Sequence, residues 1–117
     1  MKINGVELED IDVFDVEVMK RYEEAIDNVI GEVSGKESEK ISEIIGIQCN
    51  AIFHFFNKIF GDGADKKIFG SKVNLLTCIN AFEEFKEYVE KQKGDAEKIF
   101  NKYSPNRAQR RGTSKNK

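Results

Sequence analysis

Apolar residues recur three and four residues apart along most of the chain, a period that places them on one face of a helix. The first such stretch predicts a helix from Asp15 to Val33. Asp15 is a suitable N-cap, Glu17 brings a favourable negative charge to the first turn, and Gly35 is a suitable stop. The apolar face of this helix comprises Met19, Tyr22, Ile26, Val29, Ile30 and Val33.

The second stretch predicts a helix from Ser38, as its cap, to Phe60. Its apolar stripe is wide, which indicates that the helix packs on more than one side or has a face that is covered only in an oligomer. Gly46 lies in mid-helix at a cost of about 1 kcal/mol relative to alanine, and this predicts a close approach of another helix. The stripe comprises Ile41, Ile44, Ile45, Ile47, Cys49, Ile52, Phe53, Phe55, Phe56, Ile59 and Phe60.

The remaining apolar pattern predicts one more long helix and a short one. A turn at residues 61–65 and a short helical or irregular piece at 66–70 precede a third helix at 71–93. The Gly-Asp pair at 94–95 predicts a break or a kink, and a short last helix follows at 96–103. The apolar face of the third helix comprises Leu75, Leu76, Ile79, Phe82, Phe85, Tyr88 and Val89.

The two ends of the chain differ from this helical region. Residues 1–14 carry scattered apolar positions among acids, with a turn signal at Asn4-Gly5, and predict an extended N-terminal arm or a short strand. Pro105 ends regular helix, and residues 104–117 predict a flexible, disordered basic C-terminal tail. The predicted fold class is all-α, with one domain at 15–103 built as a small bundle of three long helices plus a short C-terminal helix.

Charge is segregated along the chain. From Lys102 onward there are six basic residues and no acid, so the net charge of −2 leaves the preceding residues with −8. An acidic body repels nucleic acid, whereas a basic tail attracts it, or attracts an acidic protein surface. Arg107, Arg110 and Arg111 are therefore candidate partner-binding residues, and a terminus that only keeps the protein soluble is the alternative.

Cysteine usage and hydropathy indicate the cellular compartment of the protein. Cys49 and Cys78 lie within apolar stretches and are interpreted as small core residues with free thiols. The N-terminus has no apolar leader, and no apolar run approaches the length that crosses a bilayer. We therefore expect a cytoplasmic protein that does not enter the membrane.

The chemically reactive residues do not indicate a particular reaction. His54 is the single histidine, and because the sequence suggests neither an acid nor a nucleophile beside it, we expect it at the edge of the core. Cys49 and His54 fall on different faces of a helix and Cys78 has no close partner, which argues against a zinc site. The turn at 61–65 lacks the glutamate that a calcium loop requires. We expect no enzyme activity, no metal and no cofactor.

The aromatic residues favour a core role. The chain has nine phenylalanines and no tryptophan, which predicts a phenylalanine-rich core, and a groove for a partner is an alternative that can coexist with it. Because Phe53, Phe55 and Phe56 cannot all face one neighbour on a helix, at least one of them is expected at an interface. The candidate partner-binding apolar residues are Ile47, Phe53, Phe69 and Phe100.

Three segments resemble a known group of proteins. They are FNKIFGDGADKKIFG at 56–70, NLLTCINAFEEF at 74–85 and the basic ending NRAQRR at 106–111. Together they resemble small phage and prophage proteins of Gram-positive bacteria that are encoded among tail genes and are similar to tail assembly chaperones. The resemblance covers most of the chain, from about residue 10 to residue 111.

The resemblance implies a helical, non-enzymatic protein of the bacterial cytoplasm that binds another tail protein, of tape-measure type, during assembly and that self-associates. It transfers no binding residue by position. A helical protein with surplus apolar surface would suit a long helical partner whose apolar faces need shielding. The alternative is a small nucleic-acid-binding or regulatory protein that uses the basic tail.

Overall fold

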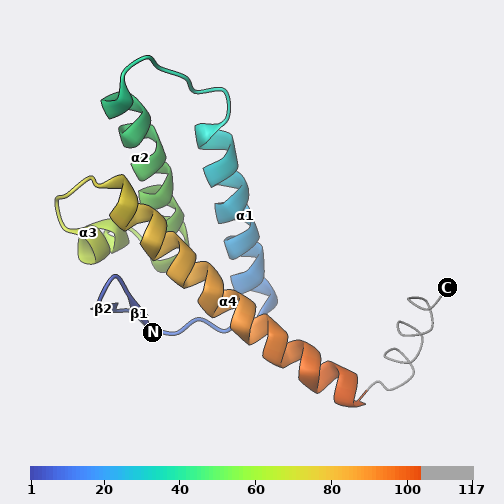
Figure 1. Cartoon of the computed structure of the whole chain (residues 1–117). Helices are drawn as coiled ribbons and strands as arrows, with labels where there is room; N and C mark the ends of the chain where they lie inside the picture. Colours follow the sequence, from blue (N-terminus) through green and yellow to red (C-terminus); the bar gives the residue numbers. More distant parts are fainter. Residues whose placement is uncertain (104–117) are drawn as a thin grey trace.

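The computed structural model describes residues 1–103 and shows four helices that follow a small N-terminal hairpin (Figure 1). The all-α fold class is therefore confirmed. The tail at 104–117, with the candidates Arg107, Arg110 and Arg111, lies outside the described residues. The elements are β1 (Lys2–Ile3), β2 (Val6–Glu7), α1 (Val16–Val33), α2 (Ile41–Phe60), α3 (Ala64–Phe69) and α4 (Leu75–Tyr103).

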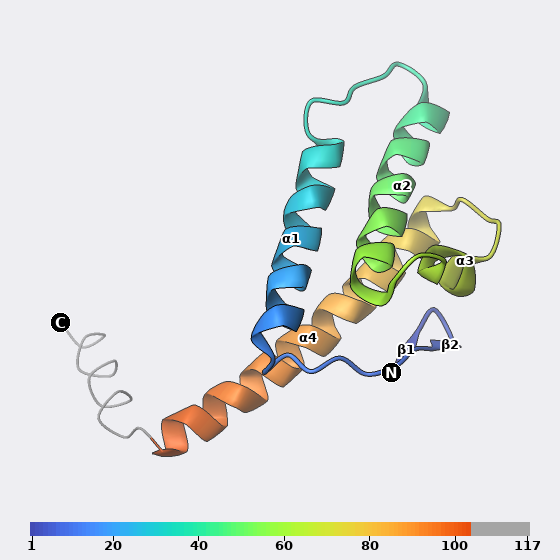
Figure 2. The same ribbon diagram turned by 180° about the vertical axis from the view of Figure 1, so that it is seen from behind.

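The helices form a hairpin that is crossed by one long helix. Helices α1 and α2 lie antiparallel, and α4 crosses the hairpin close to its open end (Figures 1 and 2). The short α3 packs beside α2, and the β1–β2 hairpin lies against α4. The last turns of α4 project beyond the rest of the body in both views. Within residues 1–103, no third helix therefore crosses the upper end of the α1–α2 hairpin.

Aromatic rings from three helices meet where α4 crosses the hairpin. The ring of Phe55 lies 6.2 Å from Tyr22 of α1, 4.9 Å from Phe82 and 5.6 Å from Phe85 of α4, between centroids. These are edge-to-face contacts, the arrangement that the ring quadrupoles favour. Phe55, Phe56 and Phe85 are fully buried. The predicted phenylalanine-rich core is thus present and lies at this crossing.

Helix α4 runs without interruption from Leu75 to Tyr103, so the predicted break at 94–95 and the separate last helix are wrong. Gly94 lies within the helix, where a glycine costs about 1 kcal/mol relative to alanine. Most of the residues around it are strong helix formers, so the long helix continues through this position. The short helix of the bundle is instead α3, at the position of the short helical or irregular piece expected at residues 66–70, so the helical alternative is present there.

The start of α2 also differs from the prediction. The N-cap is Lys40, without a capping side-chain hydrogen bond, and Ser38 stands before the helix. The Ser38 hydroxyl oxygen accepts the N–H of Lys40 at 3.1 Å, so the serine shapes the approach to the helix and does not cap it. Nothing lies within 4 Å of a β-carbon placed on Gly46, so the close helix approach expected there does not occur among the described residues.

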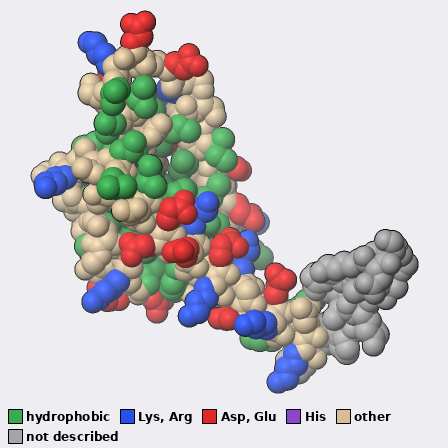
Figure 3. All heavy atoms as spheres, viewed as in Figure 1, with side chains coloured by type: hydrophobic (Ala, Val, Ile, Leu, Met, Phe, Trp, Pro, Cys, Tyr) green, Lys and Arg blue, Asp and Glu red, His purple; other side chains and the backbone are tan. Residues whose placement is uncertain are grey.

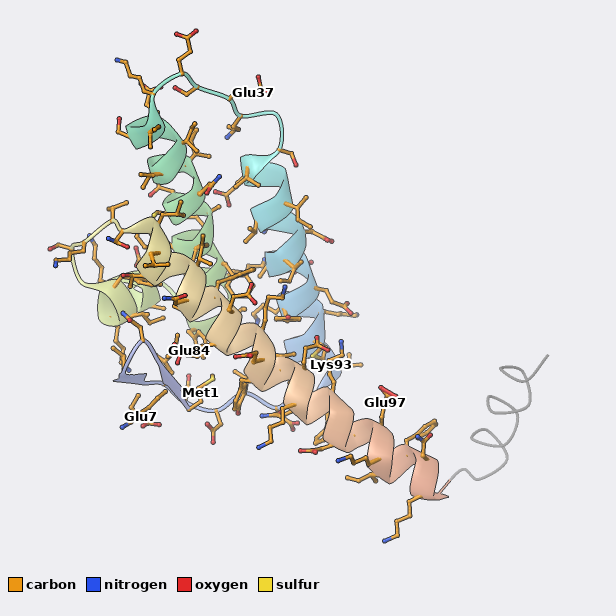
Figure 4. All side chains as sticks on the ribbon, viewed as in Figure 1. Met1, Glu7, Glu37, Glu84, Lys93 and Glu97 are labelled. Carbon is orange, nitrogen blue, oxygen red and sulfur yellow. The ribbon has the colours of Figure 1, made fainter. Side chains whose placement is uncertain are left out.

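The N-terminal segment forms a short strand hairpin that packs on the body, so of the two predicted forms, a short strand and an extended arm, the strand is present. Asn4 and Gly5 have φ values of 54° and 75°, as the tight turn of a two-residue hairpin requires. The Asn4 backbone N–H donates to Glu84 of α4 at 2.8 Å, and its side chain donates to the carbonyl of Ile68 at 2.9 Å. Figure 4 shows Glu84 of α4 close to the β1–β2 hairpin. Ile3 and Leu8 are buried in the core beneath this turn.

The cap of α1 gives a first testable prediction. The Asp15 carboxylate accepts the N–H of Val18 at 3.1 Å, as the sequence indicated. We expect Asp15→Ala to lower the free energy of unfolding by about 1 kcal/mol, because it leaves an unpaired N–H and removes a charge that favours the helix dipole. Urea unfolding measures the loss. Asp15→Asn keeps a capping oxygen, so a loss as large as that of alanine would contradict this role.

Candidate functional site

The first half of α2 carries isoleucines that the body does not bury. Every buried residue of α2 lies at or beyond Cys49, although the helix begins eight residues earlier. Ile41 is 73% exposed, and the three isoleucines that follow it are half-buried. Large apolar side chains on a folded surface mark a binding site when they are contiguous. The question is therefore which other apolar side chains lie beside them.

Two neighbouring elements also expose large apolar side chains. Ile30, in the last turn of α1, is 56% exposed, and Leu76, at the start of α4, is 69% exposed. Figure 3 shows hydrophobic side chains gathered over the upper α1–α2 hairpin and the beginning of α4 on one face of the molecule. We call this face the distal apolar surface and define it by Ile30, Ile41, Ile45, Leu76 and Ile79.

The distal apolar surface is an outward continuation of the core stripes. Ile41 and Ile45 share the helix face of the buried Ile52, and Ile30 lies one turn beyond Ile26, which packs on the core. Ile79 lies one turn before Phe82 in the same way. In Figure 1 α4 crosses the lower part of the hairpin, and Ile30 and Ile41, which lie nearer the connecting loop, are exposed.

A second apolar surface lies at the other end of α4. The last buried residue of α4 is Val89, and the helix continues from there to Tyr103 as a projecting arm (Figures 1 and 2). A shallow apolar depression of about 630 Å³ lies where this arm leaves the body. Phe14 and Ile99, which line it, are 63% and 55% exposed. We call this the arm surface; its lining residues are Phe14, Ala96, Glu97, Ile99 and Phe100.

The structure separates the four apolar residues that the sequence singled out. Phe100 is on the arm surface and is half exposed. Ile47 is half-buried on α2. Phe53 is also half-buried, and its ring lies 5.2 Å from that of Phe69. Phe69 itself is buried in the core, so the expectation that its side chain is exposed to a partner is wrong.

Sequence reasoning did not single out Ile30, Ile41, Leu76 and Ile79 as candidate binding residues. The only available signal was the excess width of the apolar stripes, which does not say which part of a stripe is covered. The position at which α4 crosses the hairpin determines which part of each stripe is buried. That position depends on contacts between segments far apart in the sequence.

His54 has a partner that the sequence did not reveal. Its Nδ1 lies 2.7 Å from the Glu32 carboxylate, which comes from α1, and the His54 side chain is largely exposed. A hydrolytic site would add a hydroxyl or thiol within hydrogen-bond reach of this imidazole. Among the described residues no such group bonds to it. The pair links α1 to α2 as an exposed contact, which contributes about 1 kcal/mol or less.

Cys49 and Cys78 face each other across the contact between α2 and α4. Both thiols are fully buried and free, as expected for small core residues. Burial is the main cause that raises the pKa of Cys78 to about 12, and the contact with Cys49 adds to it. A thiol with so high a pKa is protonated at neutral pH and is a poor nucleophile.

This raised pKa predicts a loss of stability at alkaline pH. In the unfolded chain the Cys78 thiol ionises near pH 9, whereas in the folded protein it stays protonated up to about pH 12. The contribution of the protonated thiol to the free energy of unfolding is therefore complete below pH 9 and is lost as the pH rises above 9. We expect the free energy of unfolding to fall by about 1 kcal/mol between pH 8 and pH 10. Urea unfolding at the two pH values measures this, and Cys78→Ala should show a smaller fall; an equal one would contradict the assignment.

Within residues 1–103, no three histidine, cysteine or acidic side chains gather closely enough to hold a metal ion. Over the same residues, no helix combines the length and the apolar character that crossing a bilayer would take. The apolar surfaces at the two ends of α4 are thus the features that call for a functional explanation.

Comparison with known proteins gives one family. Residues 4–114 match the model of a family described as "Family of unknown function (DUF6673)". No curated protein and no solved structure matches the chain.

Proposed function

The chain belongs to the DUF6673 family, whose function is unknown, and we propose that it is a non-enzymatic binding protein that shields an apolar helical segment of another protein. The observation that carries this proposal is the distal apolar surface. It brings together exposed aliphatic side chains from α1, α2 and α4. Exposed apolar patches of this kind on small proteins are typical of protein-binding sites.

The chemistry of the surface fits an amphipathic helix as its ligand. The five residues that define the distal apolar surface are all aliphatic. A partner helix with apolar residues at three-and-four spacing can lay them against such a surface. The half-buried isoleucines of α2 would form the floor of the contact, while the exposed Ile41 and Leu76 would flank the partner.

The resemblance to tail assembly chaperones points to one partner. A tape-measure protein is long and largely helical, and its apolar faces need cover until the tail tube assembles around it. We therefore propose a tail assembly chaperone-like role, in which the distal apolar surface holds a helical segment of a tape-measure-type protein. Of the segments that carry the resemblance, the one at 74–85 includes the start of α4, which supplies Leu76 and Ile79 to this surface.

Co-expression tests the role directly. The full chain, tagged at its N-terminus, is expressed together with the tape-measure-type protein of the same genome, and the complex is isolated through the tag. We expect the two proteins to elute together and the tape-measure-type protein to remain soluble. A chain that elutes alone, or a genome without such a gene, would overturn the assignment.

The basic tail supports a second candidate function, binding of nucleic acid. Residues 104–117 contain five basic residues and no acid. Binding by these charges would weaken steeply with salt, because each neutralised phosphate releases a counterion. Titration of labelled single-stranded and duplex DNA and RNA at 50 and 200 mM salt, with the full chain and with a chain ending at residue 103, distinguishes the two. Binding that is lost with the tail would favour this candidate, and no binding by the full chain would remove it.

A further inference from the structure

We propose that the partner of the distal apolar surface is a basic amphipathic helix that lies along α4. Its apolar residues would contact Leu76 and Ile79 at the start of α4, and its lysine or arginine residues would contact the carboxylates that follow on the same face. The inference rests on the proposed function and deepens it, because it names the charge of the segment that the chain binds.

The outward face of α4 changes from aliphatic to acidic along its length. Four exposed side chains recur at spacings of three, four and four residues, which places them on one face of the helix. This face is opposite to the one that the body buries through Cys78, Phe85 and Val89. At 1.5 Å per residue it is about 17 Å long, which is three helical turns. We call it the α4 stripe and define it by Leu76, Ile79, Glu83 and Glu87.

The acidic half of the α4 stripe has no cation bound to it within residues 1–103. There, neither the Glu83 nor the Glu87 carboxylate makes an ion pair or a hydrogen bond. Lys86, which lies between them in the sequence, holds its ammonium group over the ring of Phe82, 5.5 Å from the centroid. Because the two glutamates are one turn apart, their like charges repel and weaken the helix. A cation from another molecule would relieve this repulsion.

The aliphatic and acidic halves are presented on the same face of the molecule. Figure 3 shows acidic side chains over the middle of α4, next to the hydrophobic side chains at its start and over the upper hairpin. A helix that covers Leu76 and continues along α4 therefore meets the carboxylates within its next turns. Acidic residues at that point would be repelled, and apolar ones would desolvate the carboxylates without compensation. Lysine and arginine satisfy both halves, because their stems are apolar and their ends are charged.

The charge of the whole body favours the same class of partner. The residues before Lys102 carry a net charge of −8, so they attract a basic segment over a distance. Within α4, residues 75–91 contain four acids and two lysines. A neutral or acidic apolar helix would gain nothing from this attraction. The α4 stripe therefore selects among amphipathic helices by charge.

Two designed fluorescent peptides test this selection. Both are helical and carry leucines at three-and-four spacing in one half. In the other half the same helix face carries lysines in the first peptide and glutamates in the second, and the two peptides are otherwise identical. Fluorescence anisotropy measures their affinities for the full chain. We expect the wild type to bind the lysine peptide about 10-fold more tightly, and the preference to shrink at high salt.

Charge reversal of the α4 stripe should reverse the preference. The double variant Glu83→Lys with Glu87→Lys should bind the glutamate peptide about 10-fold more tightly than the lysine peptide. Both positions are exposed, so folding should be retained, which circular dichroism and the melting temperature check. The matched control, Glu9→Lys with Glu23→Lys, makes the same change in net charge at two exposed acids outside the stripe and should still prefer the lysine peptide. Leu76→Ser should weaken both peptides alike.

Each of three results would overturn the inference: a wild type that does not bind the lysine peptide, equal affinity for the two peptides, or a control variant that reverses the preference as the stripe variant does. A chain ending at residue 103 tests whether the tail occupies the α4 stripe. A preference for lysine that appears only in this shortened chain would overturn the assignment to a partner.

Co-elution of the tape-measure-type protein is measured separately with the wild type, the stripe variant and the control variant. We expect the stripe variant alone to lose it. Co-elution that is equal for all three refutes only this inference. A preference for the lysine peptide without co-elution by the wild type refutes only the proposed partner.

Discussion

Phe55→Ala is expected to lower the free energy of unfolding by about 3–5 kcal/mol, a large part of the stability of a domain this small. The ring of Phe55 is fully buried and contacts rings of α1, α2 and α4, so its removal leaves a cavity where the three long helices meet. The surrounding aromatic side chains are held by different helices and can collapse into that cavity only in part. Urea unfolding followed by circular dichroism measures the change.

Phe14→Ala is the matched control for this substitution. It removes the same atoms from a side chain that is 63% exposed, so we expect a change within about 0.5 kcal/mol. If Phe55→Ala cost no more than Phe14→Ala, the packing of α4 across the α1–α2 hairpin would be wrong. The comparison thus tests the contact that defines the fold.

Leu76→Glu is expected to weaken binding of the tape-measure-type partner by about 100-fold, or about 2.7 kcal/mol, with little effect on stability. The side chain of Leu76 is 69% exposed, so the folded protein loses little packing. A partner helix that covers Leu76 would have to bury the new carboxylate without a counter-charge, which is costly. Isothermal titration with the purified partner segment that co-elutes with the chain measures the affinity.

Val16→Glu provides the comparison for the binding experiment. Val16 is also aliphatic and is 66% exposed, but it lies in the first turn of α1, away from the distal apolar surface. A glutamate there favours the helix dipole, so the fold should be unaffected. Equal loss of affinity in the two variants would mean that the added charge, and no particular surface, controls binding. No loss in Leu76→Glu would remove the distal apolar surface as the binding site.

Local signals in the sequence anticipated most of the secondary structure. The periodicity predicted the course of α1 and α2, and Asp15 caps α1 as its side chain suggested. The continuity of α4 through Gly94 was missed, because a glycine weakens a helix without forbidding it. The role of the N-terminal segment was also missed. Asn4 and Gly5 signalled a turn, but the partners of that turn, Ile68 and Glu84, are more than sixty residues away.

Sequence alone determined that this chain is helical, that its core is rich in phenylalanine and that its apolar stripes are wider than a single packed face needs. These properties follow from residue type and spacing, which act locally. Only the tertiary structure decided which parts of the stripes are buried. Helix α4 covers the open end of the α1–α2 hairpin and leaves Ile41 and Leu76 exposed at the other, because that placement is set by side-chain packing between distant segments.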